Sequence, residues 1–336
     1  MGKKLKVLMV FDCQMTRPAG HDYAEDLKEE AFKGYAEINN ALKNNGHIVS
    51  MLGLHKDLRI LIDEIEKNRP DVVFNVADVF NSRSRFDKNI AWILEMLDVP
   101  YTGATPAELL ICNNKALSKQ ILSYHKIKVP QFHTFYRTRK VCRPKKIKLP
   151  LIIKPLCEEA SRGISQASVV DSDKALSERV QFIHEKMGMD AIAEEYIDGR
   201  EFYVSLMGHK RIISFPIREM KFGQVPEDEP RIATYKGKWD NEYRKKWGMR
   251  NVFVGKLPEG WEKKIFDTCK RAHRALNLKS YTRVDIRVTS EGNIYIIELN
   301  ANPNLEKDDE FANSADKAGI SFDSLVQKII NLALES

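Results

Sequence analysis

The chain has 336 residues, 43% of them hydrophobic and 30% charged, with a net charge of +7 at pH 7. This length predicts two or three domains, and the ordinary composition is typical of a soluble globular protein. No apolar run approaches a membrane span, and the short apolar stretch after Met1–Lys6 favours a buried first strand over a leader peptide. The five cysteines are odd in number and lack a Cys-x-x-Cys pair, so we expect reduced thiols in a cytoplasm.

The densest positive charge lies in one run, RTRKVCRPKKIK, at residues 137–148. It has no interleaved aromatic residues that could stack on bases, and Pro144 and Pro150 favour a loop. We therefore expect a solvated connection and no nucleic-acid partner. The modest positive charge of the whole chain suits anionic nucleotides better.

Strands and helices alternate through the first third of the chain. Strands are predicted at residues 5–11, 47–54, 70–76 and 100–103, and helices at 24–45, 58–68 and 87–97. Such alternation is typical of a parallel, doubly wound sheet. A Rossmann-like domain is therefore predicted over residues 1–114.

The remaining chain predicts two mixed α+β units, over residues 115–200 and 201–336. The first contains helices 113–124 and 172–186 and strands 134–137, 151–154, 166–170 and 190–196. The second contains strands 202–207 and 211–216, helices 261–277 and 322–334, and a β-hairpin at 284–299. The polar segment at 221–248 is too long for a simple connection, so we expect it to be functional.

The hairpin carries three oxygen donors, Asp285, Glu298 and Asn300. Residues two apart in a strand share a face, so Glu298 and Asn300 project together, and strand pairing can bring Asp285 to the same side. Acidic residues at strand ends usually face water. An acid among apolar strand residues is costly to bury without a partner, however. The pattern predicts a Mg²⁺ site and therefore ATP chemistry.

A second group of residues suits phosphate and nucleotide. Lys154 ends an apolar strand, and the small residues Ser161 and Gly163 follow it in a loop that could approach phosphate oxygens. Glu194 and Glu201 lie at strand ends, where an acid can accept hydrogen bonds from a nucleoside. Each of these charged residues could equally lie at the end of a strand and simply face solvent. Their order along the chain, followed by Asp285, favours a nucleotide site.

Seven passages together resemble the ATP-grasp superfamily, and within it the D-alanine–D-alanine ligase family. They are residues 74–104, 113–122, 152–165, 194–202, 282–288, 296–304 and 315–326, for example TRVDIRV and IIELNANPN. The resemblance covers nearly the whole chain. It implies an ATP-grasp fold with three domains: a Rossmann-like amino-terminal domain, a central lid and a carboxyl-terminal domain, with ATP between the last two.

The resemblance also implies a role for each matching residue. Lys115 and Lys154 would contact phosphates, Ser161 would lie in the covering loop, and Lys238 would close over the γ-phosphate. Glu194 and Ile197 would surround adenine, and Glu201 would bind ribose. Asp285, Glu298 and Asn300 would hold two Mg²⁺ ions, with Mn²⁺ as an alternative, and Arg283 would stabilise the transferred phosphoryl group. The family also suggests a homodimer.

The chain departs from the family at the amino-acid site. No residue of FDCQMTRPAGHDY matches the glutamate that holds the first ammonium group, and Ala160 and Trp239 replace a serine and a tyrosine. The Ser-Leu pair that binds the second carboxylate becomes Asp309-Glu310, which favours a cation. Asn304 completes this candidate substrate site.

We therefore expect an ATP-dependent ligase that joins another carboxylate to another amine through an acyl phosphate. The alternatives are a D-alanine–D-alanine ligase, a phosphate-transferring ATP-grasp enzyme and a nucleotide binder without turnover.

Overall fold

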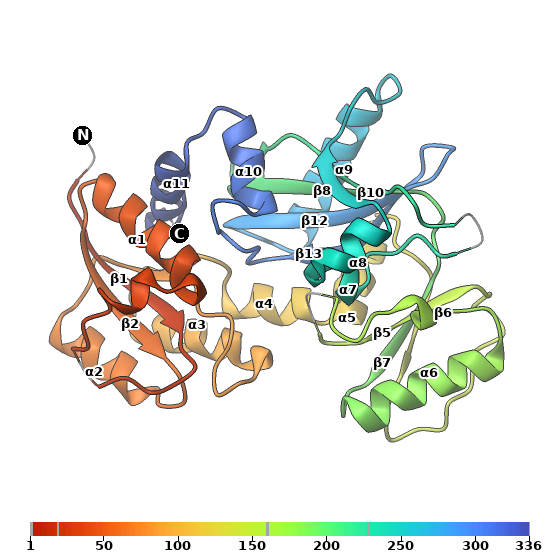
Figure 1. Cartoon of the computed structure of the whole chain (residues 1–336), viewed down its shortest axis with the longest axis horizontal. Coiled ribbons are helices and arrows are strands. Elements are labelled where there is room, and N and C mark those ends of the chain that lie inside the picture. The colour runs from red at the N-terminus through yellow and green to blue at the C-terminus, as the bar shows by residue number, and fades with distance from the viewer. Residues whose placement is uncertain (1–2, 19, 159–160, 227–228, 336) are drawn as a thin grey trace.

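Three β-sheets with helices packed against them make up the computed structural model (Figure 1). The structure describes residues 3–18, 20–158, 161–226 and 229–335, and it leaves the side chains of Arg85 and Lys238 undescribed. None of the helices in these ranges is both long enough and apolar enough to cross a membrane.

The first sheet has the strand order β2-β1-β3, and both pairs are parallel. Its elements are β1 (Lys6–Asp12), α1 (Lys33–Asn44), β2 (Ile48–Leu54), α2 (Arg59–Lys67), β3 (Val72–Asn75) and α3 (Asp87–Met96). Both faces are covered, as apolar parallel strands require. Val7 and Met9 pack in a cluster with α1 and the closing helix α11 (Phe322–Leu334), whereas Leu8 and Val10 pack with α2 and α3. The last helix therefore returns to the first sheet (Figure 1).

Two predictions for this region were wrong in extent. The helix expected from Ala24 begins at Lys33, because Glu29 is extended and divides the preceding residues into two 3₁₀ turns. The strand expected at 100–103 is a single bridge between Tyr101 and Val73. Gly103 turns the chain away there, with φ of +96°.

The middle sheet is antiparallel, with the order β4-β7-β5-β6. Its elements are β4 (Phe132–Phe135), β5 (Leu151–Pro155), β6 (Val169–Val170), α6 (Asp173–Lys186) and β7 (Ala191–Glu195). Helix α6 covers one face with apolar residues such as Val180 and Ile183. The strand predicted at 166–170 is shorter, because Ser165 and Ser168 cap a 3₁₀ turn over its first three residues.

The third sheet is antiparallel, with the order β11-β10-β8-β12-β13, and β9 adds to β8. Its strands are β8 (Arg200–Met207), β9 (Ile213–Ser214), β10 (Arg218–Phe222), β11 (Met249–Phe253), β12 (Tyr281–Val288) and β13 (Ile294–Asn300). Helix α9 (Trp261–Ala275) packs on one face through residues such as Ile265 and Ala272.

Several short elements were not predicted from the sequence. They are α4 (Pro106–Asn113), which precedes α5 (Lys115–Tyr124), strands β10 and β11, and helices α7 (Tyr235–Trp239), α8 (Asn241–Lys246) and α10 (Glu310–Lys317). Helices α7 and α8 occupy the long polar segment (Figure 1). Helix α4 lies between the first sheet and the other two (Figure 1), whereas α5 contacts β4 of the middle sheet and α9 of the third. The three sheets therefore surround a common centre at these two helices.

Candidate active site

The hairpin β12–β13 lies at this centre and sets the positions of four functional side chains. Asp285 pairs in register with Glu298, and Arg283 pairs with Asn300. The register shifts immediately after Asp285, because Ile286 pairs with Ile296 and leaves Ile297 as an extra residue in β13. Such a bulge re-aims neighbouring side chains, and bulges are common beside active sites.

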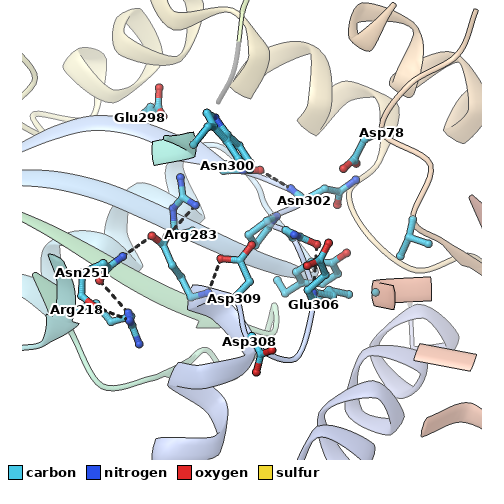
Figure 2. Close-up of a pocket in the computed structure, with 18 of the residues that line it drawn as sticks. Asp78, Arg218, Asn251, Arg283, Glu298, Asn300, Asn302, Glu306, Asp308 and Asp309 are labelled. Carbon is cyan, nitrogen blue, oxygen red and sulfur yellow. Dashed lines mark hydrogen bonds and ion pairs between the residues drawn. The ribbon is translucent and has the colours of Figure 1, made fainter. Parts of the chain in front are cut away.

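Two cavities meet at Glu298. The main cavity, of about 520 Å³, is lined by Lys115, Arg283, Asn300 and Glu310, among others (Figure 2). The second, which we call the lid crevice, lies between the middle sheet and the hairpin. Its lining includes Lys154, Ser161, Glu194, Ile197, Glu201, Asp285 and Arg287. Glu298 lines both spaces, so a group in one can approach a group in the other.

Three lysines surround the inner end of these spaces. Lys154 Nζ lies 3.0 Å from Glu194 Oε2, and Lys119 Nζ lies 2.9 Å from Glu194 Oε1. Lys115 donates to the carbonyl of Glu158 and lies 3.8 Å from Glu298 Oε2. Burial would raise the pKa of Glu194, but the two lysine charges hold that pKa below its ordinary value.

Lys119 was not singled out from the sequence. It could have been found from its spacing: it follows Lys115 by four residues, so both side chains lie on one face of α5. Burial lowers the pKa of the Lys119 ammonium, and the carboxylate of Glu194 opposes that shift. The predicted Glu194 and Lys154 do meet in the structure, and Lys119 joins them.

The outer part of the lid crevice is organised by Arg287, which was also not predicted. Its Nη2 lies 2.8 Å from Glu201 Oε2, and its Nη1 donates to the carbonyl of Ile197 at 2.8 Å. Tyr203 donates its hydroxyl to the other oxygen of Glu201 at 2.8 Å. The buried guanidinium of Arg287 therefore binds both the carbonyl of Ile197 and the carboxylate of Glu201, two residues that the sequence predicted for the nucleotide site.

Two loops cover the site. Ser161 and Gly163 take left-handed backbone angles, with φ of +57° and +74°. The amide of Tyr235, at the start of α7, donates to the carbonyl of Ile164 at 3.0 Å, so the polar segment contacts the small-residue loop. The backbone of Lys238 lies in α7, next to Trp239 of the main cavity, whereas its side chain and all of Ala160 lie outside the described residues.

Arg283 is held between two carboxylates. Its Nε lies 2.7 Å from Asp285 Oδ1, and its Nη1 lies 3.1 Å from Glu310 Oε2. Asn251 donates to the other oxygen of Glu310 and accepts a hydrogen bond from Arg218 (Figure 2). Burial would lower the pKa of Arg283, but its acidic neighbours keep it well above the ordinary value, so the guanidinium stays charged.

Acidic side chains concentrate at the far end of the main cavity. Glu306, Asp308 and Asp309 line it (Figure 2), as do Glu310 and Asn304. Asp309 caps α10 by accepting the amide of Glu310 at 2.6 Å, and burial raises the pKa of this carboxyl group. Asn304 accepts the amide of Glu306 at 3.2 Å. The structure thus brings the three predicted substrate-site residues together.

The oxygen donors of the hairpin fit a Mg²⁺ ion. Asp285 and Glu298 offer carboxylates on paired strands, and Asn300 adds an amide oxygen, which also accepts the amide of Asn302 at 3.0 Å. Among the described residues, no group of three or more His, Cys, Asp or Glu could hold a metal. A hard cation that is bound by few protein oxygens and by substrate phosphates suits such a donor set.

Comparisons with known proteins agree with this geometry. The family described as "D-ala D-ala ligase C-terminus" matches residues 121–331. A D-alanine–D-alanine ligase of Aquifex aeolicus is 28% identical over 303 residues, which are 90% of this chain and 95% of that protein. An uncharacterized protein of Sinorhizobium fredii, y4sG, is 29% identical over 262 residues, 78% of this chain and 74% of the other.

The fold also matches a solved structure. The D-alanine–D-alanine ligase of Bacillus anthracis complexed with ATP has a TM-score of 0.76 and 20% identity, and the match covers 98% of both chains. The predicted ATP-grasp fold is therefore confirmed. The chain belongs to the D-alanine–D-alanine ligase family, and it is an ATP-dependent ligase that forms carbon–nitrogen bonds and uses a divalent metal.

Proposed function

We propose that this ligase joins a carboxylate to an amine other than D-alanine, and that its acceptor carries a cationic group in place of the carboxylate of an amino acid. One observation carries the proposal. Asp309 and Glu310, which stand where the family resemblance places a carboxylate-binding Ser-Leu pair, line the main cavity beside Glu306 and Asp308. An incoming carboxylate would face like charges there, whereas an ammonium or guanidinium group would be attracted.

The nucleotide is assigned to the lid crevice and its junction with the main cavity. Lys115 and Lys154 flank Glu298 and would contact phosphates, with Ser161 and Lys238 in the covering loops. Glu194 and Ile197 would lie around adenine and Glu201 on ribose. Asp285, Glu298 and Asn300 would hold two Mg²⁺ ions, which would supply positive charge at the transferred phosphoryl group.

In the first step, an oxygen of the donor carboxylate attacks the γ-phosphorus of ATP, and ADP leaves. The acyl phosphate now carries a good leaving group. The acceptor nitrogen then attacks the acyl carbon, loses a proton, and displaces inorganic phosphate to give an amide. Arg283 lines the main cavity together with Glu298, and its fixed charge would stabilise the negative charge of the phosphoryl group and of the tetrahedral intermediate.

The lid crevice has a volume of about 70 Å³, room for only a handful of water molecules. Nucleotide entry therefore requires the middle sheet and its loop to move away from the hairpin. The contact between Tyr235 and Ile164 would have to open or to move as a unit. Such lid movement is common in enzymes that exclude water from phosphoryl transfer.

A phosphate-release assay over a panel of acceptors tests the proposal. Donor carboxylates are paired with D-alanine, with neutral amines, and with amines that carry a second cation, such as diamines and the amide of arginine. We expect the highest kcat/KM with the cationic acceptors. Transfer of oxygen-18 from a labelled donor carboxylate into phosphate would support the acyl phosphate. Selective dimerisation of D-alanine would refute the altered acceptor and support a D-alanine–D-alanine ligase, the activity named for the Aquifex aeolicus relative.

The five cysteines are free thiols, which supports our assignment of the enzyme to the cytoplasm. A homodimer remains a proposal from the family resemblance. Light scattering of the purified chain at several concentrations tests it.

A further inference from the structure

Lys119 of α5 is a deeply buried charged group beside the lid crevice, with 1% of its surface exposed. Its ammonium contacts two other elements. It lies 2.9 Å from Glu194 Oε1 on β7 and donates to the carbonyl of Ile297 on β13 at 2.5 Å. Ile297 is the bulged residue next to Glu298, so Lys119 connects the lid sheet to the catalytic hairpin.

The charges in this cluster do not balance. Glu194 supplies one negative charge, and it is shared by Lys119 on one oxygen and Lys154 on the other. A buried charge without a partner is strongly unfavourable. This cluster of one carboxylate and two ammonium groups therefore carries one net positive charge, which an anion can balance, and the lysine of the cluster that lines the crevice is Lys154.

A lysine that binds phosphate must give up part of its contact with Glu194. If Lys154 were the only ion-pair partner of Glu194, this movement would leave a fully buried carboxylate without a counter-ion. Lys119 removes that cost, because it remains on Glu194 when Lys154 moves. Its second bond, to the carbonyl of Ile297, keeps it from following Lys154.

We propose that Lys119 is a positioning residue for nucleotide binding: it retains Glu194 as its ion-pair partner and so frees Lys154 to bind the phosphates of ATP. The inference depends on the proposed contact between Lys154 and phosphate. It predicts that Lys119 contributes to the binding of ATP but not to the binding of adenosine, which has no phosphates.

The test compares the affinities of the full chain for Mg²⁺-ATP and for adenosine by calorimetry. In K119M we expect the affinity for ATP to fall about tenfold or more, the effect of one charge-assisted contact, while the affinity for adenosine stays within about twofold. The exposed Lys128, which donates to Asn293, provides the matched control K128M, which should change neither affinity. An equal loss of both affinities in K119M, or no loss of either, would overturn the proposal.

A second pair of variants gives a result even if K119M fails to fold. In E194Q the carboxylate is neutral, so Lys119 has no charge to retain. The ratio of the ATP affinity to the adenosine affinity should then be the same in E194Q and in K119M/E194Q. A further tenfold loss of this ratio in the double variant would show that Lys119 acts directly, and the positioning role would be wrong. If the wild-type chain itself fails to bind Mg²⁺-ATP, the proposed nucleotide site fails first, which is a distinct outcome.

Discussion

Glu310, in the first turn of α10, lies 3.1 Å from the guanidinium of Arg283 on β12, and the opposite edge of that guanidinium lies 2.7 Å from Asp285. The arginine expected to stabilise the reaction is thus shared between a carboxylate of the proposed metal site and a carboxylate of the proposed acceptor site. A group that binds at either carboxylate changes the charge that surrounds Arg283. In the proposed reaction, this relationship would connect acceptor recognition with catalysis.

The variant E310Q tests whether Glu310 binds the acceptor or only holds Arg283. If Glu310 attracts a cationic acceptor, the KM for that acceptor should rise about tenfold, the worth of one charge-assisted hydrogen bond, with little change in kcat. Steady-state phosphate release at varied acceptor concentration measures both constants. The control E25Q removes a carboxylate from an exposed ion pair with Lys28 and should have no effect. A lower kcat with unchanged KM would instead mean that Glu310 only holds Arg283.

Glu298 should be indispensable, because it lies at the junction of the two cavities and would supply one of the two carboxylates proposed for the metal. We expect E298Q to lower kcat at least about a hundredfold, and chelation of divalent ions to abolish turnover of the wild type. Turnover as a function of Mg²⁺ concentration measures this. The control E291Q changes an exposed acid in the turn of the same hairpin. Wild-type rates for E298Q at every Mg²⁺ concentration would rule out the metal site.

Much of this site could be predicted because its chemistry lies in short, continuous segments. The period of two in β12 and β13 was enough to place Asp285 and Glu298 on one hairpin, and the register confirms that they are opposite each other. The alternating elements of the first 100 residues likewise indicated the parallel sheet. Periodicity fixes such local geometry whenever one face of an element is buried.

The parts that were missed depend on contacts between distant segments. The roles of Lys119 and Arg287 become visible only when α5 and β12 meet β7 and β8, 75 and 86 residues away in sequence. The bulge at Ile297 has no signal in an apolar strand. Helix α10 was missed because its cap, Asp309, was interpreted only as a substrate ligand, although an aspartate is also a common helix cap.

His273 makes the stability of the fold sensitive to acid. It is fully buried in α9, its ring contacts the carbonyl of Gly208 at 2.9 Å, and burial lowers its pKa to about 4. The unfolded chain binds this proton below about pH 6.5, whereas the folded chain binds it only below about pH 4. The contribution of neutral His273 to the free energy of unfolding is therefore fully present above pH 6.5. It is lost as the pH falls towards 4, and the loss amounts to about 3 kcal/mol.

Urea unfolding at pH 7 and at pH 4.5 checks this. The variant H273Q has no proton to gain, so its stability should depend less on pH than that of the wild type. The control H125Q changes an exposed histidine and should retain the full pH dependence. If H273Q and the wild type lose the same free energy of unfolding between the two pH values, His273 is not the sensitive group.

Gly163 should limit how the covering loop closes over the lid crevice. Its φ is +74°, and an added Cβ would lie 2.7 Å from the sulfur of Met187 and 3.0 Å from the ring of Pro155. The methionine can move, but the proline ring at the end of β5 cannot, so the loop must shift. We expect G163A to raise the KM for ATP about fivefold or more, as a loss of about 1 kcal/mol in binding would do.

Gly188 supplies the matched control for that variant. It has a similar φ of +65°, but an added Cβ there would meet only Arg137, at 3.8 Å. G188A therefore has the same backbone strain, about 1 kcal/mol, without the crowding. Both variants should lose stability, and only G163A should bind ATP more weakly. If the two variants have the same KM for ATP, crowding at Met187 and Pro155 does not control the loop, and the covering role of the Ser161–Gly163 segment loses its support.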